Sequence, residues 1–257
     1  MSLAELLAAR GPAWPAPIEH LGEVGSTSDV LKASARRGAP EWSVVVADRQ
    51  SSGRGRMGHQ WSSPPGNLFL SVLLRPRFSA VTLLPLAAGL AVAEALPELD
   101  TRLKWPNDVL VKSRKLAGIL AEAQSGPAGL ESVVVGIGVN VGLMPEDLPP
   151  PLRATATSWR METGTPRDPL EVAAAVLGRL GVWYHALAGG DAAAVVAAWR
   201  GRSVPWWGRE VRARCGDQDL RGIARGISAA GALLIEAPDG SRHEILAGEV
   251  HEIRPLA

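Results

Sequence analysis

The chain has 257 residues, enough for one sizeable hydrophobic core and a second small one, so we expect one or two domains. Its 27 basic and 26 acidic residues nearly cancel, which argues against bulk nucleic-acid binding, because such binding normally needs a strong positive excess. A single cysteine, Cys215, excludes an intramolecular disulfide, and together with scattered, unpaired histidines it predicts no metal site.

The N-terminus fits neither a signal peptide nor a membrane anchor. The longest apolar run, residues 81–97, is interrupted by Pro85 and Glu94. Spanning a bilayer takes roughly 18 to 20 uninterrupted apolar residues, so this run predicts a buried helix and no membrane partner. We expect the protein in the reducing cytoplasm.

The first part of the chain predicts alternating strands and helices. Hydrophobic periodicity and capping signals give a short helix, a strand, a helix capped by Ser26 or Thr27, a strand and a buried return strand, at residues 2–10, 18–24, 26–35, 42–48 and 67–74. Between the last two strands lies a loop with the sequence GRGRMGHQW, which we call the Gly/Arg loop, residues 53–61.

The middle of the chain continues this alternation. It predicts an apolar helix, two short strands around a Pro-Asn-Asp turn and two longer strands, at residues 81–96, 102–105, 108–111, 115–123 and 132–140. We expect the last strand to end in a glycine-rich bend at Gly136, Gly138 and Asn140. From Asp168, a long alanine-rich helical region extends to about Arg200.

The sequence pattern changes beyond Val204, from alternating strands and helices to short strand-like segments. Short segments separated by Gly and Asp-Gly turns predict a small all-β module of about fifty residues. The chain is therefore expected to form a mixed α/β domain at residues 1–203 and an all-β domain at residues 204–257.

The Gly/Arg loop matches the dinucleotide fingerprint G-x-G-x-x-G only as a bare pattern. That fingerprint must run into a helix whose N–H groups meet the phosphates, whereas here Pro64 and Pro65 block a helix. Arg54 and Arg56 alternate with glycines, so each guanidinium can offer bidentate hydrogen bonds to a phosphate or carboxylate. Two such arginines have no good packing role, and we expect a lid that closes over an anion.

Four sequence clusters need a common explanation: STS at residues 26–28, Gln50 with the Gly/Arg loop, KWPNDV with KLAGIL, and GIGVN ending at Asn140. In this order they resemble biotin protein ligases, whose pattern combines a short Ser/Thr-rich turn, Q-x-x-GRGRxGRxW, KWPND, K-x-x-GIL and G-x-G-x-N. The resemblance covers nearly the whole chain, since GALLIE and GEV fit the small domain that ends bacterial members. It implies a mixed sheet with flanking helices, similar to class II aminoacyl-tRNA synthetases, followed by an SH3-like β-barrel.

The resemblance implies a two-step reaction. ATP and biotin give biotinyl-5'-AMP and pyrophosphate, and a lysine of a biotin carboxyl carrier domain then takes the biotinyl group. Mg²⁺ is expected with the ATP. Many members carry an N-terminal winged helix-turn-helix that has no counterpart here, so we predict no specific DNA binding, and a homodimer would fit the family.

Matching motif positions implies roles for individual residues. The ureido ring of biotin would be held by neutral donors and acceptors, from Ser26, Thr27, Ser28 and Gln50. The biotinyl chain, its carboxyl group and the phosphate would be contacted by Arg54, Gly55, Arg56 and Lys115. The nucleotide would be bound by stacking of Trp61 on adenine, by Asn140 at the adenine edge, and by Lys104 and Asn107. Asp108 would orient either the acceptor lysine or a magnesium ion.

Three positions depart from the family pattern. Ser28 stands where asparagine is frequent, Met57 where arginine occurs in some members, and His59 where the second Gly-Arg pair usually has its arginine. Because histidine titrates near neutrality, we hypothesise that closure of the lid depends on pH.

Plainer readings and rival functions stay open beside this one. Lys104 could be a surface cation, Asn107 could only shape its turn, and Trp61 could only anchor its loop. One rival is a lipoate ligase of the same fold, although the chain lacks that family's R-R-x-S-G-G-G loop. Another is a non-enzymatic nucleic-acid-binding or scaffold module, against which the near-zero net charge counts.

Overall fold

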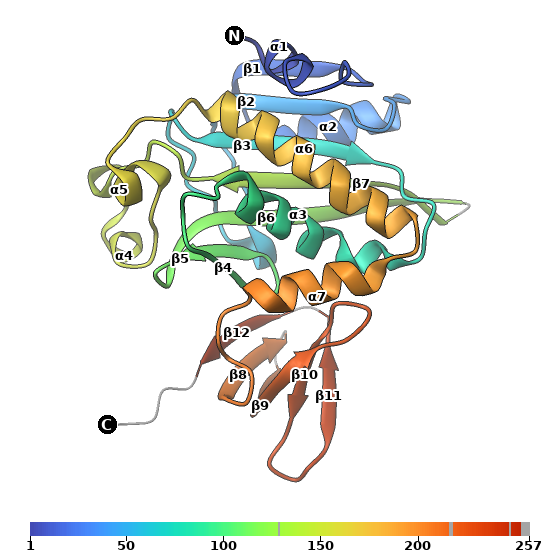
Figure 1. The fold of residues 1–257 in the computed structure, drawn as a ribbon, viewed down its shortest axis with the longest axis vertical. Coiled ribbons are helices and arrows are strands. Elements are labelled where there is room, and N and C mark those ends of the chain that lie inside the picture. Colours follow the sequence, from blue (N-terminus) through green and yellow to red (C-terminus); the bar gives the residue numbers. More distant parts are fainter. Residues whose placement is uncertain (128, 216–217, 247, 253–257) are drawn as a thin grey trace.

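A computed structural model describes residues 1–127, 129–215, 218–246 and 248–252. It contains a larger sheet of seven strands and a smaller sheet of five (Figure 1). The larger sheet has the order β1-β2-β3-β7-β6-β5-β4, with the bounds Ile18–Val24, Val44–Gln50, Leu68–Leu74, Gly129–Val139, Arg114–Gly126, Asp108–Val111 and Thr101–Lys104. Only β1 and β2 pair in parallel, and the remaining neighbours are antiparallel.

The smaller sheet is antiparallel throughout, with the order β11-β10-β9-β8-β12. Its strands have the bounds Arg242–Ile245, Leu233–Glu236, Gln218–Ile227, Glu210–Cys215 and Glu249–Glu252. The mixed α/β part and the all-β part therefore follow one another as predicted, while the boundary between residues 203 and 204 remains a prediction.

Helices cover both faces of the larger sheet (Figure 1). On one face α3 (Leu84–Ala95) packs against α6 (Pro169–Ala188) and β6, and α7 (Ala192–Arg202) lies beside α3. On the other face α2 (Thr27–Arg36) packs against β2, β3 and β7. The remaining helical segments are short: α1, η1, η2, η3, α4 and α5, at Leu3–Ala8, Arg56–Gly58, Ala80–Leu83, Pro145–Asp147, Pro150–Arg153 and Trp159–Thr163.

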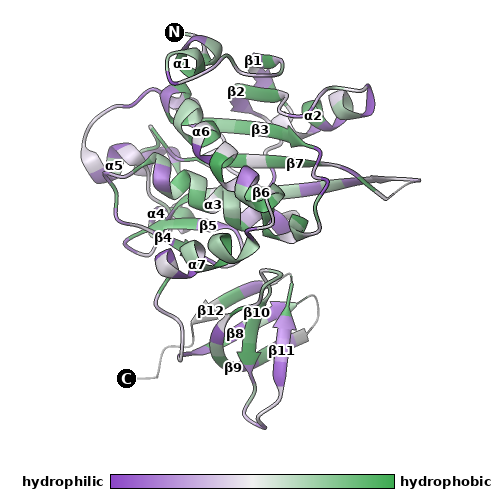
Figure 2. Ribbon diagram, turned by 45° about the vertical axis from the view of Figure 1, so that its right-hand side comes forward, coloured by the Kyte–Doolittle hydropathy of each residue, from purple (hydrophilic) through white to green (hydrophobic). Residues whose placement is uncertain are grey.

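This layering explains the apolar stretches of the sequence. All seven residues of β3 are buried because the strand is covered on both faces, and β2, β3 and α3 appear mainly hydrophobic in Figure 2. One hydrophobic cluster continues from the larger sheet into the smaller one, and the indole N–H of Trp105 donates to the carbonyl of Gly231 at 2.9 Å. None of the described helices combines the length and the apolarity that crossing a bilayer requires.

The predicted bend at Gly136 and Gly138 is wrong, because β7 continues without interruption through Val139. The two glycines make room above the sheet instead. A Cβ atom on Gly136 would lie 2.8 Å from the hydroxyl of Ser28, and one on Gly138 would lie 2.6 Å from the indole of Trp61. These positions are therefore small because other side chains lie directly on the strand.

Candidate active site

A cavity of about 630 Å³ opens on the larger sheet, beside the smaller one. Its walls come from the start of α2, the Gly/Arg loop, the turn between β4 and β5, strands β6 and β7, and residues 143–156 and 248–250. Every site residue predicted from the sequence lines this cavity, namely Ser26, Thr27, Ser28, Gln50, Arg54, Gly55, Arg56, Trp61, Lys104, Asn107, Asp108, Lys115 and Asn140. The fold thus brings the four sequence clusters to one place.

One end of the cavity is neutral and polar, and we call Ser26, Thr27, Ser28 and Gln50 the polar floor. Ser26 is the N-cap residue of α2 but makes no capping hydrogen bond with its side chain. The backbone N–H and the hydroxyl of Thr27 both lie within hydrogen-bond distance of Gln50 Oε1, at 2.9 and 3.1 Å. The three hydroxyl residues are at most 5 % exposed, so their groups are held in a largely desolvated place.

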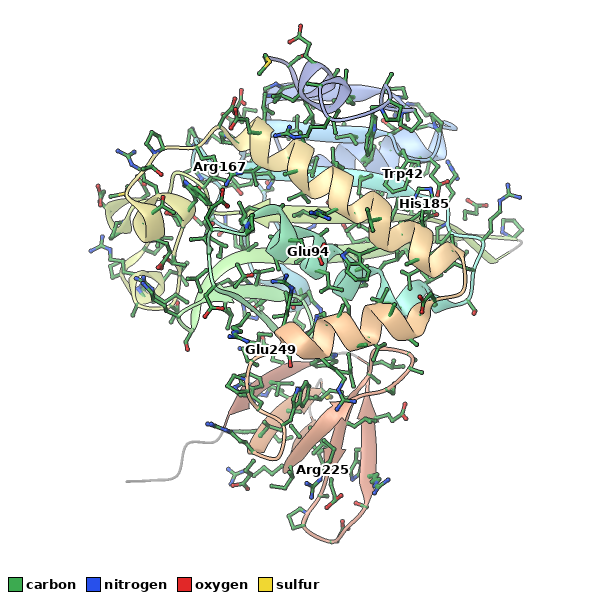
Figure 3. The ribbon with its side chains drawn as sticks, in the orientation of Figure 1. Trp42, Glu94, Arg167, His185, Arg225 and Glu249 are labelled. Atoms are coloured by element: carbon green, nitrogen blue, oxygen red, sulfur yellow. The ribbon has the colours of Figure 1, made fainter. Side chains whose placement is uncertain are left out.

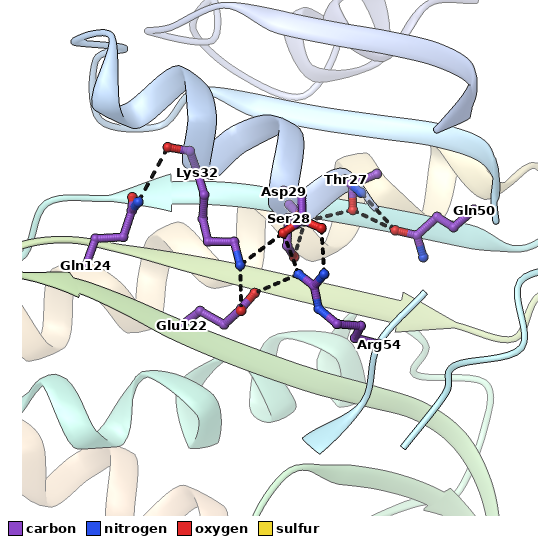
Figure 4. A network of polar contacts seen from close by, with 9 residues as sticks. Thr27, Ser28, Asp29, Lys32, Gln50, Arg54, Glu122 and Gln124 are labelled. Carbon is purple, nitrogen blue, oxygen red and sulfur yellow. Dashed lines mark hydrogen bonds and ion pairs between the residues drawn. The ribbon is translucent and has the colours of Figure 1, made fainter. Parts of the chain in front are cut away.

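Arg54 does not extend into the cavity as an unpaired cation (Figure 4). Its two terminal nitrogens lie 2.5 and 2.6 Å from the carboxylate oxygens of Asp29, and one is 3.7 Å from Glu122. Lys32 bridges the same two carboxylates at 3.1 and 2.7 Å. The hydrogen bonds from Arg54 are the main reason why the pKa of Asp29 falls to about 2. The loop is therefore fastened to α2 and β6 at Arg54.

The Gly/Arg loop closes on itself and on the smaller sheet. Gly55 N donates to the carbonyl of His59 at 2.7 Å, and Trp61 N donates to that of Gly53 at 2.9 Å. Gly53 must lack a side chain, because a Cβ there would lie 2.6 Å from the hydroxyl of Ser63. His59 Nε2 lies 3.0 Å from the carboxylate of Glu249. Figure 3 shows Glu249 at the junction of the two sheets. Of the three positions that depart from the family pattern, His59 is thus the one whose side chain reaches the other sheet.

The other end of the cavity is cationic, and we call Arg56, Lys104 and Lys115 the cationic end. Burial is the first cause that lowers the pKa of both Arg56 and Lys104, and Asp108 only partly offsets it. Lys115 Nζ lies 2.6 Å from Asp108 Oδ1. No acidic group of the described chain forms an ion pair with Arg56 or Lys104. An anion entering the cavity would relieve this desolvated positive charge.

Trp61 lies flat against the larger sheet. A Cβ on Gly118 would lie 2.9 Å from its ring, and one on Gly138 would lie 2.6 Å from it. The ammonium group of Lys115 is 5.3 Å from the ring centroid, within cation–π range. Trp61 therefore connects the end of the loop with β6, β7 and the cationic end.

The two asparagines each hold the backbone in addition to lining the cavity. Asn107 Nδ2 donates to the carbonyl of Ile119 at 2.9 Å and ties the turn between β4 and β5 to β6. Asn140 Nδ2 donates to the carbonyls of Thr157 and Lys115 at 2.9 and 3.3 Å. The amide protons of Asn140 are thus occupied, so only its Oδ1 can serve a ligand, as an acceptor.

Several residues of the site were missed in the sequence. Ser71 is the only polar residue of the strand LFLSVLL, a signal that could have indicated its role behind the polar floor. Glu249 belongs to the GEV segment, but its contact with His59 joins two distant parts of the chain. The apolar wall near the cationic end also went unnoticed, at Leu143, Leu148, Leu152 and Ala156.

Comparisons with known proteins agree with this geometry. Residues 23–140 match the biotin/lipoate A/B protein ligase family, and residues 207–251 match the biotin protein ligase C terminal domain. The biotin--[acetyl-CoA-carboxylase] ligases of Paracoccus denitrificans and Mycobacterium tuberculosis are 34% and 35% identical to the chain. These alignments cover 88% and 98% of this chain, respectively, and 95% of each relative.

A solved structure supports the same assignment. Biotin protein ligase from Aquifex aeolicus, in complex with biotin and ATP, has a TM-score of 0.80 and 32% identity, covering 92% of this chain and 99% of that one. The chain belongs to the biotin protein ligase family. The family resemblance and the fold class predicted from the sequence are thereby confirmed.

Proposed function

We propose that this chain joins biotin to ATP, forming biotinyl-5'-AMP, and then transfers the biotinyl group to a lysine of a biotin carboxyl carrier domain. The observation that carries the proposal is the single cavity in which a neutral polar floor and a cationic end face one ligand-sized space. The relatives named as biotin ligases and the related structure with bound biotin and ATP support it.

Biotin would bind with its ureido ring on the polar floor. The ring has two N–H donors and one carbonyl acceptor, and the floor offers hydroxyl oxygens and the amide of Gln50 within one desolvated pocket. Because these groups are neutral, they hold the ring without the desolvation cost of a buried charge. The acyl chain of biotin would then run toward the cationic end.

Adenylation brings the biotin carboxylate and the α-phosphate of ATP together. A carboxylate oxygen forms the new bond to phosphorus, and pyrophosphate leaves with the electrons of the broken P–O bond. Arg56, Lys104 and Lys115 would neutralise the two anions and stabilise the charge that develops in the transition state. No covalent enzyme intermediate is needed, since positioning and electrostatics lower the barrier.

Mg²⁺ would enter as part of the ATP substrate. Within the described residues no group of three or more His, Cys, Asp or Glu side chains is placed to hold a metal by itself. The acidic side chains in the cavity lining are those of Asp108 and Glu249, and carboxylates combined with phosphate oxygens suit this ion. Asp108 would contact it, or would orient the acceptor lysine in the second step.

Transfer requires that water stay away from the adenylate. The amine of the carrier lysine attacks the activated carbonyl and AMP leaves, whereas attack by water would waste the intermediate. The Gly/Arg loop, fastened at Arg54 and His59, would cover the adenylate until the carrier arrives. Trp61 would stack on adenine and Asn140 would accept a hydrogen bond at its edge.

Biotin-dependent exchange of pyrophosphate into ATP tests the proposal and separates it from its rivals. A lipoate ligase would show the exchange with lipoate instead of biotin, and a nucleic-acid-binding or scaffold module would show none. Exchange with biotin that exceeds exchange with lipoate is the expected result, and exchange with neither acid would contradict the proposal.

A cytoplasmic location, a homodimer and the absence of specific DNA binding complete the proposal. Sedimentation at increasing protein concentration, with and without biotin and ATP, measures the oligomeric state. A mobility shift of biotin-operator DNA in the presence of biotin and ATP would contradict the expected lack of DNA binding.

A further inference from the structure

The direction of the hydrogen bonds behind the polar floor follows from the chemistry of the groups. The backbone N–H of Thr27 lies 2.9 Å from a side-chain amide atom of Gln50. A backbone N–H can only donate, so this atom is the oxygen Oε1 and not the nitrogen. The hydroxyl of Thr27 lies 3.1 Å from the same oxygen, which only accepts. Thr27 Oγ1 therefore donates its single proton to Gln50.

Once the hydroxyl proton of Thr27 is assigned, the directions of two more hydroxyl protons, those of Ser71 and Ser28, follow from it. Ser71 Oγ lies 2.8 Å from Thr27 Oγ1 and must donate to it, because Thr27 has no second hydroxyl proton. Ser28 Oγ lies 3.0 Å from Ser71 Oγ and must donate to it for the same reason. All three hydroxyl protons thus point along one path that leads away from Ser28.

The path continues to the base of the Gly/Arg loop. Gln50 Nε2 donates to Ser63 Oγ at 3.3 Å, and Ser63 donates to the carbonyl of Trp61 at 3.1 Å. We call the whole path the hydroxyl relay, which runs from Ser28 through Ser71, Thr27, Gln50 and Ser63 to Trp61. Because it ends on a backbone carbonyl, which cannot rotate to become a donor, its direction is fixed at that end as well.

The relay leaves lone pairs, and not protons, on the hydroxyls that a ligand meets. Thr27 and Ser28 both line the cavity, and they donate their hydroxyl protons to Gln50 and Ser71, respectively. Ser71 lies outside the lining, on β3, and is 0 % exposed. The polar floor therefore presents acceptors at Thr27 and Ser28, which match the N–H donors of a ureido ring. Gln50 keeps a second amide proton that its bond to Ser63 does not use.

We propose that Ser71 is a positioning residue that determines specificity, because it accepts the hydrogen bond from Ser28, fixes Ser28 as an acceptor beside Thr27, and so selects a head group that carries N–H donors. This inference rests on the proposed function. Without Ser71 Oγ, the hydroxyl of Ser28 is free to rotate and can turn its proton toward the ligand N–H. Two donors then face each other and no hydrogen bond forms. A head group without such donors, for example the dithiolane of lipoate, leaves buried acceptors unpaired, which is the costly case in recognition.

The test compares Ser71→Ala with the unchanged protein on two ligands. The first ligand is biotin, and the second is a biotin analogue in which oxygen replaces one ureido N–H. We expect Ser71→Ala to weaken biotin binding about tenfold in calorimetry, while the KM for ATP in pyrophosphate exchange stays the same. The preference of the protein for biotin over the analogue should fall about threefold or more in the variant.

Ser132→Ala is the matched control, since Ser132 on β7 is also buried and its hydroxyl also donates a hydrogen bond to a side chain, that of Gln124, but outside the cavity lining. The control should keep both the affinity and the preference. If Ser71→Ala does not fold, Ser71→Cys applies the same test, because a thiol fills the space but is a weak donor and acceptor.

Two failures can be told apart. Absence of biotin-dependent exchange in the unchanged protein would overturn the proposed function. Normal exchange together with an unaltered preference in the Ser71 variant, or an equal loss in Ser132→Ala, would overturn the role of Ser71 alone.

Discussion

The two ends of the cavity are prepared in opposite ways. At the polar floor the hydroxyl protons of Thr27 and Ser28 both have partners, Gln50 and Ser71, so these two neutral groups are already oriented before a ligand arrives. At the cationic end, burial lowers the pKa of Arg56 and Lys104, and neither forms an ion pair with a described carboxylate. The floor is preorganised for a neutral ring, whereas the cationic end is complete only when an anion is bound.

The same contrast separates the two arginines of the Gly/Arg loop. Arg54 is held by Asp29 and fastens the loop, while Arg56 is half-buried in the cavity without such a partner. In the sequence the two residues cannot be distinguished, since both are arginines that alternate with glycines. In the structure the first anchors the loop, and the second remains available for an anion in the cavity.

Lys115→Gln should have the largest effect, because it removes a positive charge from the end of the cavity where we propose that the α-phosphate reacts. We expect the rate of biotin-dependent pyrophosphate exchange to fall about 10²- to 10³-fold, with little change in biotin affinity. Lys112→Gln, in the same hairpin but 76 % exposed, is the control and should retain the rate. Equal rates of pyrophosphate exchange in the two variants would show that Lys115 does not contribute to adenylation.

Arg56→Ala should release the adenylate about 10- to 100-fold faster, since a charge-assisted hydrogen bond to the phosphate is lost. The released adenylate should label nearby lysines indiscriminately. Arg54→Ala should change the release rate less, because the guanidinium of Arg54 is already paired with Asp29. Stopped-flow measurement of the rate of adenylate release tests this distinction. Equal release rates in the two variants, or an unchanged release rate in Arg56→Ala, would contradict it.

Gly138→Ala should disturb the contact of Trp61 with the sheet, because the new Cβ would lie 2.6 Å from the indole. We expect a loss of about 1–3 kcal/mol in the free energy of unfolding, measured in urea, and a raised KM for ATP. Gly22→Ala on β1 adds a methyl group where nothing lies within 4 Å, so it should leave the KM unchanged. If Gly138→Ala left both the free energy of unfolding and the KM for ATP unchanged, the contact between the indole and Gly138 would not matter for stability or for ATP binding.

His59 should make retention of the adenylate weakly dependent on pH. Its bond to Glu249 is a charged pair only while the imidazole is protonated. We expect the dissociation rate of the adenylate to rise about two- to threefold between about pH 5.5 and 8, and His59→Arg to abolish this rise. A flat rate over that range in the unchanged protein would refute the idea.

Asp29→Asn should have the smallest effect, at most about 1 kcal/mol in the free energy of unfolding at neutral pH, because the ion pair is half-exposed. The pKa of Asp29 is lowered in the folded state from 3.8 to about 2, mainly by Arg54. Its stabilisation is therefore complete above the higher value and disappears as the pH falls through the lower one. In urea titrations, the difference in the free energy of unfolding between Asp29→Asn and the unchanged protein should shrink over this pH interval. A constant difference would contradict the assignment.

The sequence was informative wherever a motif carried its own chemistry. The Gly/Arg loop, Gln50, the lysines of the cationic end and Asn140 could be placed in one site because their spacing is specific to the family. The strand bounds of β1, IEHLGEV, were also predictable, since a run of residues with strand propensity is a local property.

Pairings between distant segments could not be predicted. Asp29 and Glu122 hold Arg54 across 25 and 68 positions of the chain, and no local pattern distinguishes them from other surface carboxylates. Ser71 was visible as a polar residue in an apolar strand, but its partners Thr27 and Ser28 come from another element. The glycines of β7 suggested a bend because sequence alone did not show which side chains lie above them.

The central claim is that both ends of this cavity act on one acyl-adenylate. Incubation of the protein with ATP, Mg²⁺, biotin and a purified biotin carboxyl carrier domain, followed by mass measurement of the carrier, tests it most directly. We predict one added biotinyl group on a single lysine, dependent on both ATP and biotin. An unmodified carrier in the presence of all components would contradict the account.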